Sequence, residues 1–218
     1  MRINTNINAM IATNQMTKNT ALAGSSMEKL STGLRITKAG DDAAGLAVSE
    51  KMRAQIRGME QAERNVQDGI SMVQTAEGAL EEAGNIAQRM RELGVQAGND
   101  TLSSSDRAKI KTELSELQKE MSDISKEAKF NGKELLSANA ASSTITIQAG
   151  ANSEVREIKM TDLASIANSV SITGDLSTVG EAQAFVGKVD KALEAINSGR
   201  STLGTMQNRL EYTSNNLT

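Results

Sequence analysis

A seven-residue apolar repeat runs through the middle of the chain and constrains the fold more than any other feature. It occupies residues 43–98, where apolar residues follow one another at steps of three and four that sum to seven. The members at intervals of seven are Met52, Met59, Val66, Val73 and Leu80. A helix with this period keeps one side against a neighbouring helix and favours left-handed winding. At a rise of about 1.5 Å per residue, the stretch predicts a rod of roughly 80 Å.

Two further stretches carry the same period. After a turn at "GNDTLSSSDRA", a helix is expected to run to about Ala128 and to fold back antiparallel on the first. Another helix is expected from Val179 onward, although Arg200 stands where its stripe predicts an apolar side chain. The packing seam of the three helices is expected to contain Met52, Ile56, Met59, Val66, Ile70, Val73, Leu80, Ile110, Leu114, Leu117, Met121, Ile124, Val189, Leu193, Ile196, Leu203 and Leu210.

The composition agrees with long helices around an aliphatic core. The 218 residues include three aromatic side chains, Phe130, Phe185 and Tyr212, and neither Trp nor Pro. Large aromatic residues usually anchor compact cores, and Pro breaks helix interiors. Long unbroken helices are therefore favoured over a compact domain with an aromatic core.

The residues available for chemistry argue against an enzyme. The chain has no His, which removes the commonest general base and the Ser-His-Asp arrangement. Without His and Cys the usual zinc and iron ligand sets are missing, so neither metal nor cofactor is expected. Asp41 and Asp42 form the densest acidic pair, but adjacent carboxylates at a helix start are far more often caps than acid/base pairs. The eleven Met residues could form an adaptable groove, but most lie on the seams, where core filling is favoured.

Residues 1–33 are expected to form a helix of unusual chemistry. The segment is built from Asn, Thr, Ala, Ile and Met, with no charge between Arg2 and Lys18. Asn and Thr are mediocre helix formers, so the segment alone should be frayed or disordered. One explanation is a floppy terminus, but the uncharged, periodic pattern favours a helix that forms only against a partner.

The period changes after Phe130. The stretch "STITIQAGANSEVREIKM" alternates around a Gly-Ala-Asn-Ser turn and predicts a β-hairpin, whereas residues 161–177 are expected to be mostly irregular. The predicted fold is mainly α, an elongated bundle of long antiparallel helices with heptad packing plus a small β-hairpin insert. The expected divisions are a partner-dependent helix at 1–33, a connector at 34–45, a helical rod at 46–129 and 179–218, and a short insert at 130–178.

Charge and hydropathy argue against two classes of partner. With 24 basic and 27 acidic residues, the chain lacks the basic region that nucleic-acid binders carry. No run of about 18 apolar residues occurs, so membrane insertion is not expected. The start "MRINTNINAMIATNQMTKN" lacks the apolar stretch and cleavage site of a secretory signal peptide.

Long motifs of this chain resemble bacterial flagellin. They are "MRINTNINAM", "MEKLSTGLRITKAGDDAAGLAVSEKMRAQIRG", "NVQDGISMVQTAEGALEEAGNIAQRMRELGVQAGND", "FNGKELL" and "LGTMQNRLEYTSNNL". They follow the family's order, and several lie outside the heptad repeats, so chance similarity between coiled helices does not explain them. The hook–filament junction protein starts similarly and is the alternative, although that family prefers a Pro in the region of "DDAA". An intracellular helical adaptor is a third candidate, which the uncharged N-terminal helix disfavours.

The resemblance implies a structural subunit of the bacterial flagellar filament, which serves motility. Flagellins are exported unfolded through the flagellar type III apparatus, without a cleaved signal peptide, and polymerise at the growing tip outside the cell. The implied partners are other flagellin subunits, the export chaperone and the cap. In the family the N-terminal helix pairs with a C-terminal helix beyond the "NNL" motif. The chain stops at Thr218, so the chain alone is expected to have a mobile N-terminal segment and to form no filaments.

Flagellins are also ligands of the innate immune receptor Toll-like receptor 5. The motif behind that recognition resembles "QRMREL", with a facing acid on the third helix. Position by position, it implies receptor contacts at Arg89, Leu93 and Glu113. The alternative is that these are helix-surface residues that pack between subunits, and the two roles are compatible. Gly94 follows Leu93 where many family members have Ala, which could weaken the site.

Overall fold

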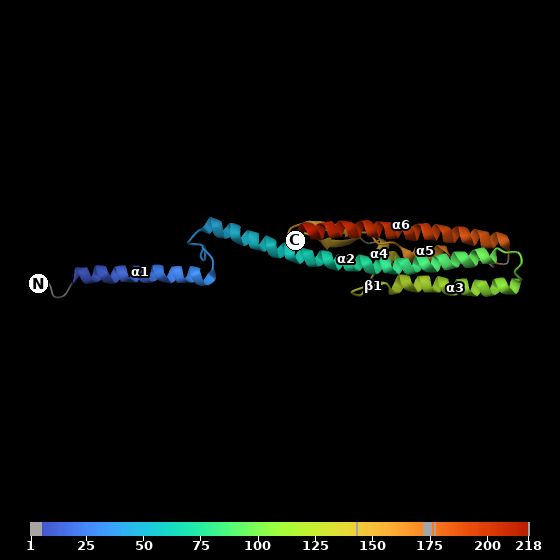
Figure 1. The fold of residues 1–218 in the computed structure, drawn as a ribbon, viewed down its shortest axis with the longest axis horizontal. Helices are drawn as coiled ribbons and strands as arrows, with labels where there is room; N and C mark the ends of the chain where they lie inside the picture. Colours follow the sequence, from blue (N-terminus) through green and yellow to red (C-terminus); the bar gives the residue numbers. More distant parts are fainter. Residues whose placement is uncertain (1–5, 143, 172–175, 177, 218) are drawn as a thin grey trace. The chain divides into compact units, whose positions relative to one another are not determined.

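The computed structural model describes residues 6–142, 144–171, 176 and 178–217. The long helices are α1 (Ile7–Thr32), α2 (Ala43–Ala97), α3 (Ser104–Glu127) and α6 (Val179–Leu217). The short helices are α4 (Ala138–Ser142) and α5 (Leu163–Ser169), and the strands are β1 (Lys129–Phe130), β2 (Lys133–Glu134), β3 (Ile145–Gln148) and β4 (Val155–Ile158). The predicted class, mainly α with long heptad-packed helices and a small antiparallel hairpin, is confirmed (Figure 1).

The chain divides into two units, Met1–Arg57 and Gly58–Thr218, and the boundary falls inside α2. The first unit therefore contains α1, the connector and the first turns of α2. The expected divisions after residues 33 and 45 both lie inside this unit.

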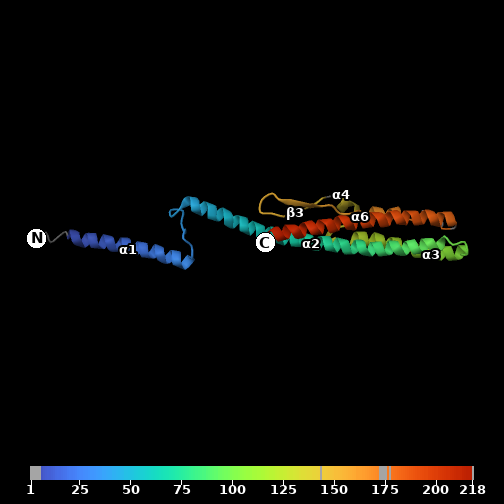
Figure 2. The ribbon, with the colours of Figure 1, turned by 45° about the horizontal axis from the view of Figure 1, so that its top comes forward.

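In the second unit, α2, α3 and α6 run along one another (Figures 1 and 2), and α2 is seen between the other two in Figure 1. Small residues of α2 mark the contact with α6, because a Cβ atom at Gly84 would lie 3.8 Å from Ile196 Cγ2 and one at Gly69 would lie 3.6 Å from Leu210 Cδ1. From the first contact to the second, residue numbers fall along α2 and rise along α6, so the two helices are antiparallel. Close approach at glycine explains why α2 tolerates residues that weaken isolated helices.

The turn between α2 and α3 is fixed by polar contacts. The Ser103 hydroxyl accepts the backbone N–H of Asp106 at 3.3 Å and donates to the Asp106 carboxylate at 2.7 Å. Arg107 is buried, and its guanidinium donates to the Asn99 carbonyl at 3.1 Å. These bonds satisfy N–H and C=O groups that helix ends leave without partners. As a result α3 folds back along α2, as the heptad spacing predicts.

The insert between α3 and α6 contains more structure than the sequence indicates. Strands β3 and β4 pair antiparallel in unbroken register from Ile145↔Ile158 to Gln148↔Val155. The expectation that residues 161–177 are mostly irregular is wrong for Leu163–Ser169, which form α5 and contact both α3 and α6, whereas residues 172–175 and 177 lie outside the described residues. Leu163 and Ala167 of α5 are buried. Burial against two long helices, rather than intrinsic propensity, therefore holds this seven-residue helix.

A second, smaller hairpin precedes the β3–β4 hairpin in the chain. Strands β1 and β2 are joined by Asn131 and Gly132, with φ of 49° and 78°. Two consecutive positive φ values are typical of the tight hairpin turn that Asn-Gly prefers. The buried pair Leu135 and Leu136 follows directly and joins the main core.

The core follows the apolar seams of the three long helices of the second unit. Four seam residues are half-buried: Met59, Leu117, Ile124 and Leu193. Eleven are 0–8% exposed: Val66, Ile70, Val73, Leu80, Ile110, Leu114, Met121, Val189, Ile196, Leu203 and Leu210.

Two residues of the expected seam are not in the core. Met52 is 59% exposed and Ile56 is 51% exposed, and burial along α2 begins at Ala62. The heptad period identifies the apolar side of a helix but does not say where a neighbouring helix covers it. The placement of Met52 and Ile56 in the core is therefore corrected.

Candidate functional site

The motif residues on α2 and α3 form an exposed charge cluster. Arg89 of α2 donates to Glu113 Oε1 of α3 through Nη2 at 2.9 Å and through Nε at 3.3 Å. It also donates to Glu92 at 3.2 Å. Hydrogen bonds to Glu113 and then to Glu92 raise the pKa of the Arg89 guanidinium above its usual value. The side chains of Arg89 and Glu113 are 52% and 48% exposed, so a partner protein can reach both.

Leu93 lies one helical turn beyond Arg89 but does not share this surface. It is 2% exposed and belongs to the main core. A partner that binds the folded chain cannot touch the Leu93 side chain, so its expected role as a direct contact is corrected. From inside the core it supports the segment of α2 that carries Arg89.

Three ion pairs join α2 to α6, and sequence patterns did not reveal them. Arg91 donates to Asp190 at 2.6 Å. Arg200, which interrupts the apolar stripe, reaches Glu77 at 3.8 Å and Glu81 at 3.6 Å. Steps of three or four between opposite charges on one helix signal pairs along it. Pairs between helices can be found only once the register of the two helices is known.

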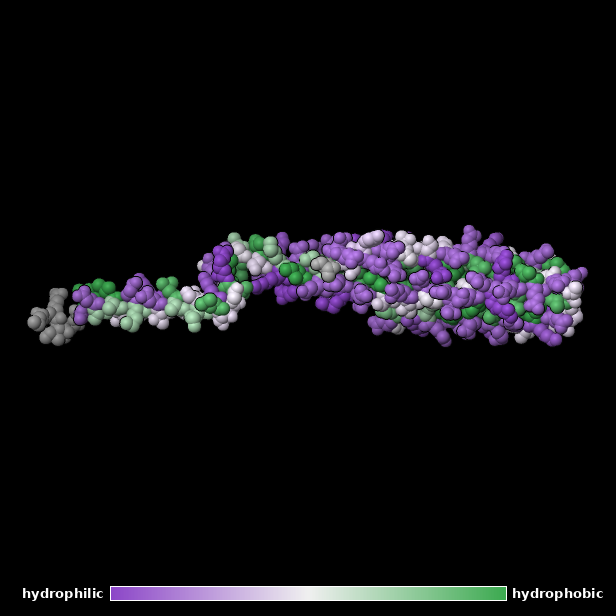
Figure 3. Space-filling model, viewed as in Figure 1, coloured by the Kyte–Doolittle hydropathy of each residue, from purple (hydrophilic) through white to green (hydrophobic). Residues whose placement is uncertain are grey.

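The second candidate surface is α1. All of Ile7–Thr32 is described, and no residue in this range is buried. Hydrophobic side chains are visible on its surface in Figure 3. The large ones, 59–78% exposed, are Ile7, Met10, Ile11, Met16, Leu22, Met27 and Leu30.

Several threonines of α1 are satisfied within the helix, and an Asn side chain caps its start. The Asn6 side chain accepts the N–H of Ala9 at 3.2 Å and caps the first turn. The hydroxyls of Thr13, Thr17 and Thr20 each donate at 2.9 Å to the carbonyl four residues earlier. A threonine bonded in this way presents its methyl group outward. The surface of α1 is therefore more apolar than its Thr content suggests.

The acidic pair in the connector consists of helix and loop supports. Asp42 accepts the N–H of Gly45 at 2.9 Å and so caps α2. Asp41 accepts the Thr37 N–H at 3.3 Å and lies 3.6 Å from Lys29. The Thr37 hydrogen bond and the Lys29 charge hold the pKa of Asp41 below its usual 3.8. Asp42 is thus a helix cap, and Asp41 fixes the connector.

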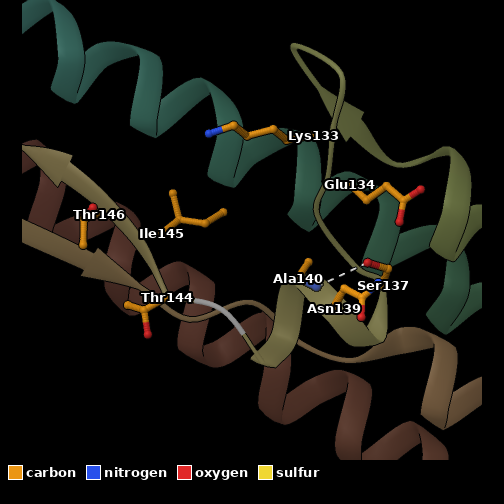
Figure 4. Close-up of a pocket in the computed structure, with 8 residues that line it drawn as sticks. All are labelled: Lys133, Glu134, Ser137, Asn139, Ala140, Thr144, Ile145 and Thr146. Atoms are coloured by element: carbon orange, nitrogen blue, oxygen red, sulfur yellow. Dashed lines mark hydrogen bonds between the residues drawn. The ribbon is translucent and has the colours of Figure 1, made fainter.

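An open hollow of about 510 Å³ lies between the small hairpin and β3 (Figure 4). Lys133 and Glu134 lie on one side and Thr144, Ile145 and Thr146 on the other. Its floor near α4 is held by the Ala140 N–H, which donates to the Ser137 hydroxyl at 3.3 Å. In the part of the chain that the structure describes, no group of three acidic residues is placed to bind a metal ion. The exposed surfaces, rather than a reactive pocket, are the candidate sites.

Residues 3–141 match the model of the bacterial flagellin N-terminal helical region, and residues 186–218 match that of the C-terminal helical region. This chain belongs to the bacterial flagellin family. The flagellin of Halalkalibacterium halodurans is 49% identical over 220 residues, which cover 100% of this chain and 80% of that protein. The "Flagellar filament 33 kDa core protein" of Treponema phagedenis is 41% identical, and the matched region covers 98% of this chain and 79% of that protein.

A solved structure agrees with the fold of this flagellin. The crystal structure of Bacillus cereus flagellin has a TM-score of 0.64 and 32% identity, and covers 72% of this chain and 89% of its own. Family membership makes the chain a structural protein of the bacterial flagellar filament rather than an enzyme. In the described part of this flagellin, no helix has the length and apolarity that a membrane crossing requires.

Proposed function

We propose that this flagellin is exported unfolded, polymerises with copies of itself at the tip of the filament, and buries α1 between subunits as it does so. The observation that carries the proposal is the exposure of α1. Its 26 residues include none that is buried, yet they present seven large apolar side chains. A surface of this kind is typical of a protein interface.

The apolar side chains of α1 point to more than one side. At 3.6 residues per turn, Ile7 and Ile11 lie on one side of the helix, and Met16 and Met27 lie on the opposite side. A surface helix of a single domain has one apolar stripe, whereas a helix that is apolar all round is surrounded. We therefore infer that neighbours cover α1 from at least two directions in the filament.

Weak intrinsic stability suits the export step. Ordering each backbone residue costs roughly 1–2 kcal/mol, whereas fully burying a Leu, Ile or Met side chain contributes about 1.5–3 kcal/mol. An isolated α1 gains little of the second term because none of its residues is buried. The segment can therefore pass unfolded through the type III apparatus with an export chaperone, and become ordered under the cap outside the cell.

We also propose that the Arg89–Glu113 cluster is the contact surface for Toll-like receptor 5 on the free subunit. The cluster is exposed, carries a shared hydrogen-bonded pair, and lies on two helices fixed by the core. Charged side chains held by a rigid scaffold lose less freedom on binding than flexible ones. Leu93 enters this proposal as a support beneath α2, not as a contact.

Filament growth tests the assembly proposal. In bacteria that build their filament from this subunit, Ile11→Asn with Met16→Asn should abolish filaments, because each change removes an apolar group from a different side of α1. The matched control is Ile11→Leu with Met16→Leu, which should keep filaments. Unfolding of the second unit should be unchanged in both variants, because neither residue belongs to its core. Normal filaments from the Asn variant would refute burial of α1.

A further inference from the structure

The methionines of this flagellin divide between its two units by exposure. Of the eleven, Met1 lies outside the described residues, and Met59 and Met206 are half-buried. Those in the first unit are 59–70% exposed: Met10, Met16, Met27 and Met52. The remaining ones, in the second unit, are 0–7% exposed: Met72, Met90, Met121 and Met160.

Exposure decides which thioethers react with a peroxide. The sulfur lone pair attacks one oxygen of hydrogen peroxide, the O–O bond breaks, and the sulfur–oxygen bond of the sulfoxide forms. The second oxygen leaves as water after proton transfer. Sulfur thus gives up two electrons, and the peroxide is reduced. The product is a polar, chiral group in place of a flexible apolar one, and sulfoxide reductases reverse the change.

We propose that Met10, Met16, Met27 and Met52 are the sites of oxidation by peroxide in the free subunit, and that oxidation of the three on α1 prevents incorporation into the filament. The second part rests on the proposed function, in which the surface of α1 becomes buried. A sulfoxide oxygen enclosed there would lose its hydrogen bonds with water. Burying a polar group without a partner is unfavourable, so oxidised subunits would be excluded.

The positions of these sulfurs make the effect hard to avoid. Met10 belongs to the side of α1 that carries Ile7 and Ile11, whereas Met16 and Met27 lie on the other side. Oxidation therefore alters both sides that are expected to meet neighbours. The second unit stays folded, because the sulfurs of Met90 and Met121 are shielded in its core. The oxidised subunit would remain folded there but unable to assemble, and reduction would restore it.

The sites are tested by mass spectrometry of peptides from the full-length subunit after timed exposure to hydrogen peroxide. The four exposed sulfurs should each gain an oxygen atom roughly tenfold faster than Met72, Met90 and Met121. Similar rates for the exposed and buried groups would overturn the assignment. This measurement does not depend on assembly, so it stands or falls separately from the proposed function.

The effect on assembly is tested by elongation of filament fragments with added subunits. The subunits are purified from the bacterium in the form that it exports. Untreated, they must elongate the fragments, and their failure would refute the proposed function instead. Peroxide-treated subunits should lose elongation, and a methionine sulfoxide reductase should restore it. The Met10→Leu, Met16→Leu, Met27→Leu, Met52→Leu variant should resist peroxide, whereas Met59→Leu with Met206→Leu should remain sensitive.

Two outcomes would overturn the assembly part of the inference. One is elongation by treated wild-type subunits at the untreated rate. The other is equal loss of elongation in the resistant variant, which would place the damage elsewhere. Where the fourfold variant fails to elongate fragments even before treatment, the reductase experiment on wild type decides. Recovery of elongation by peroxide-treated wild-type subunits after reduction supports the inference, and failure to recover refutes it.

Discussion

Gly94 of α2 packs directly against Phe185 of α6. A Cβ atom at Gly94 would lie 3.1 Å from Phe185 Cδ1 and 2.9 Å from Val186 Cγ2, closer than side chains normally approach. Phe185 is 4% exposed and is the buried aromatic side chain of the described core. The small residue after Leu93 therefore serves the contact between α2 and α6, rather than loosening α2.

This contact predicts opposite effects of the same substitution at two glycines. Gly94→Ala should destabilise the second unit, because overpacking costs typically about 1–3 kcal/mol and outweighs a gain in helix propensity of about 1 kcal/mol. Gly78→Ala is the control, because no described heavy atom outside its own stretch of helix lies within 4 Å of its Cβ position. It should raise stability by up to about 1 kcal/mol. Urea unfolding followed by circular dichroism measures both, and a stabilising Gly94→Ala would contradict the packing.

The corrected limits of the seam predict unequal costs of truncation along α2. Leu80→Ala should lower the free energy of unfolding by about 2–5 kcal/mol, because Leu80 is fully buried. Met52→Ala should change it by no more than about 0.5 kcal/mol, because Met52 is mostly exposed. Chemical denaturation of the two variants checks the difference. Comparable losses would mean that the packed seam extends to Met52 after all.

The Arg89–Glu113 cluster predicts a loss of receptor signalling without a loss of fold. Arg89→Ala or Glu113→Ala should lower the response of Toll-like receptor 5 to free subunits, because each removes an exposed charge. Arg91→Ala is a control on another side of α2, where the side chain pairs with Asp190. Cell reporter assays measure the response, and circular dichroism checks that all variants fold. Unchanged signalling by both single variants and by the double variant would rule out the site.

The connector should respond to acid through Asp41. Its folded-state pKa lies below 3.8, so the Thr37–Asp41 contact is fully present above that pH and is lost as the pH falls through the lower, folded-state value. We expect the Thr37 amide resonance to titrate with a midpoint below 3.8. Asp41→Asn should abolish the step. A midpoint at or above 3.8 in the wild type would show that the contact does not form in solution.

Periodicity predicted the long helices because their contacts repeat along one side. Val66, Val73 and Leu80 are buried, as the seven-residue spacing predicts. The α5 helix was missed because its seven residues are too few to show a repeated apolar pattern and because they depend on distant helices for burial. Met52 continues the apolar repeat without being buried, since a repeat carries no information on the extent of its partner.

The candidate site was only partly visible in the sequence. Arg89 and Glu113 could be located from a motif, and they do meet across two helices. Leu93 belongs to the same motif and lies one helical turn from Arg89, which predicts a shared face, yet the Leu93 side chain is buried in the core. The motif therefore located the site on α2, but it did not predict which of its side chains are exposed.

The threonines of α1 have a consequence for the interface proposed here. Because Thr13, Thr17 and Thr20 donate to their own helix, neighbouring subunits need supply no acceptor for these hydroxyls. The threonines then present no hydroxyl that needs a partner, and the apolar side chains of α1 make contacts with little directional preference. Neighbouring helices can therefore shift slightly against these side chains without breaking hydrogen bonds to the threonines. Such an interface selects partners by shape complementarity and the exclusion of water, and it tolerates bending of the filament.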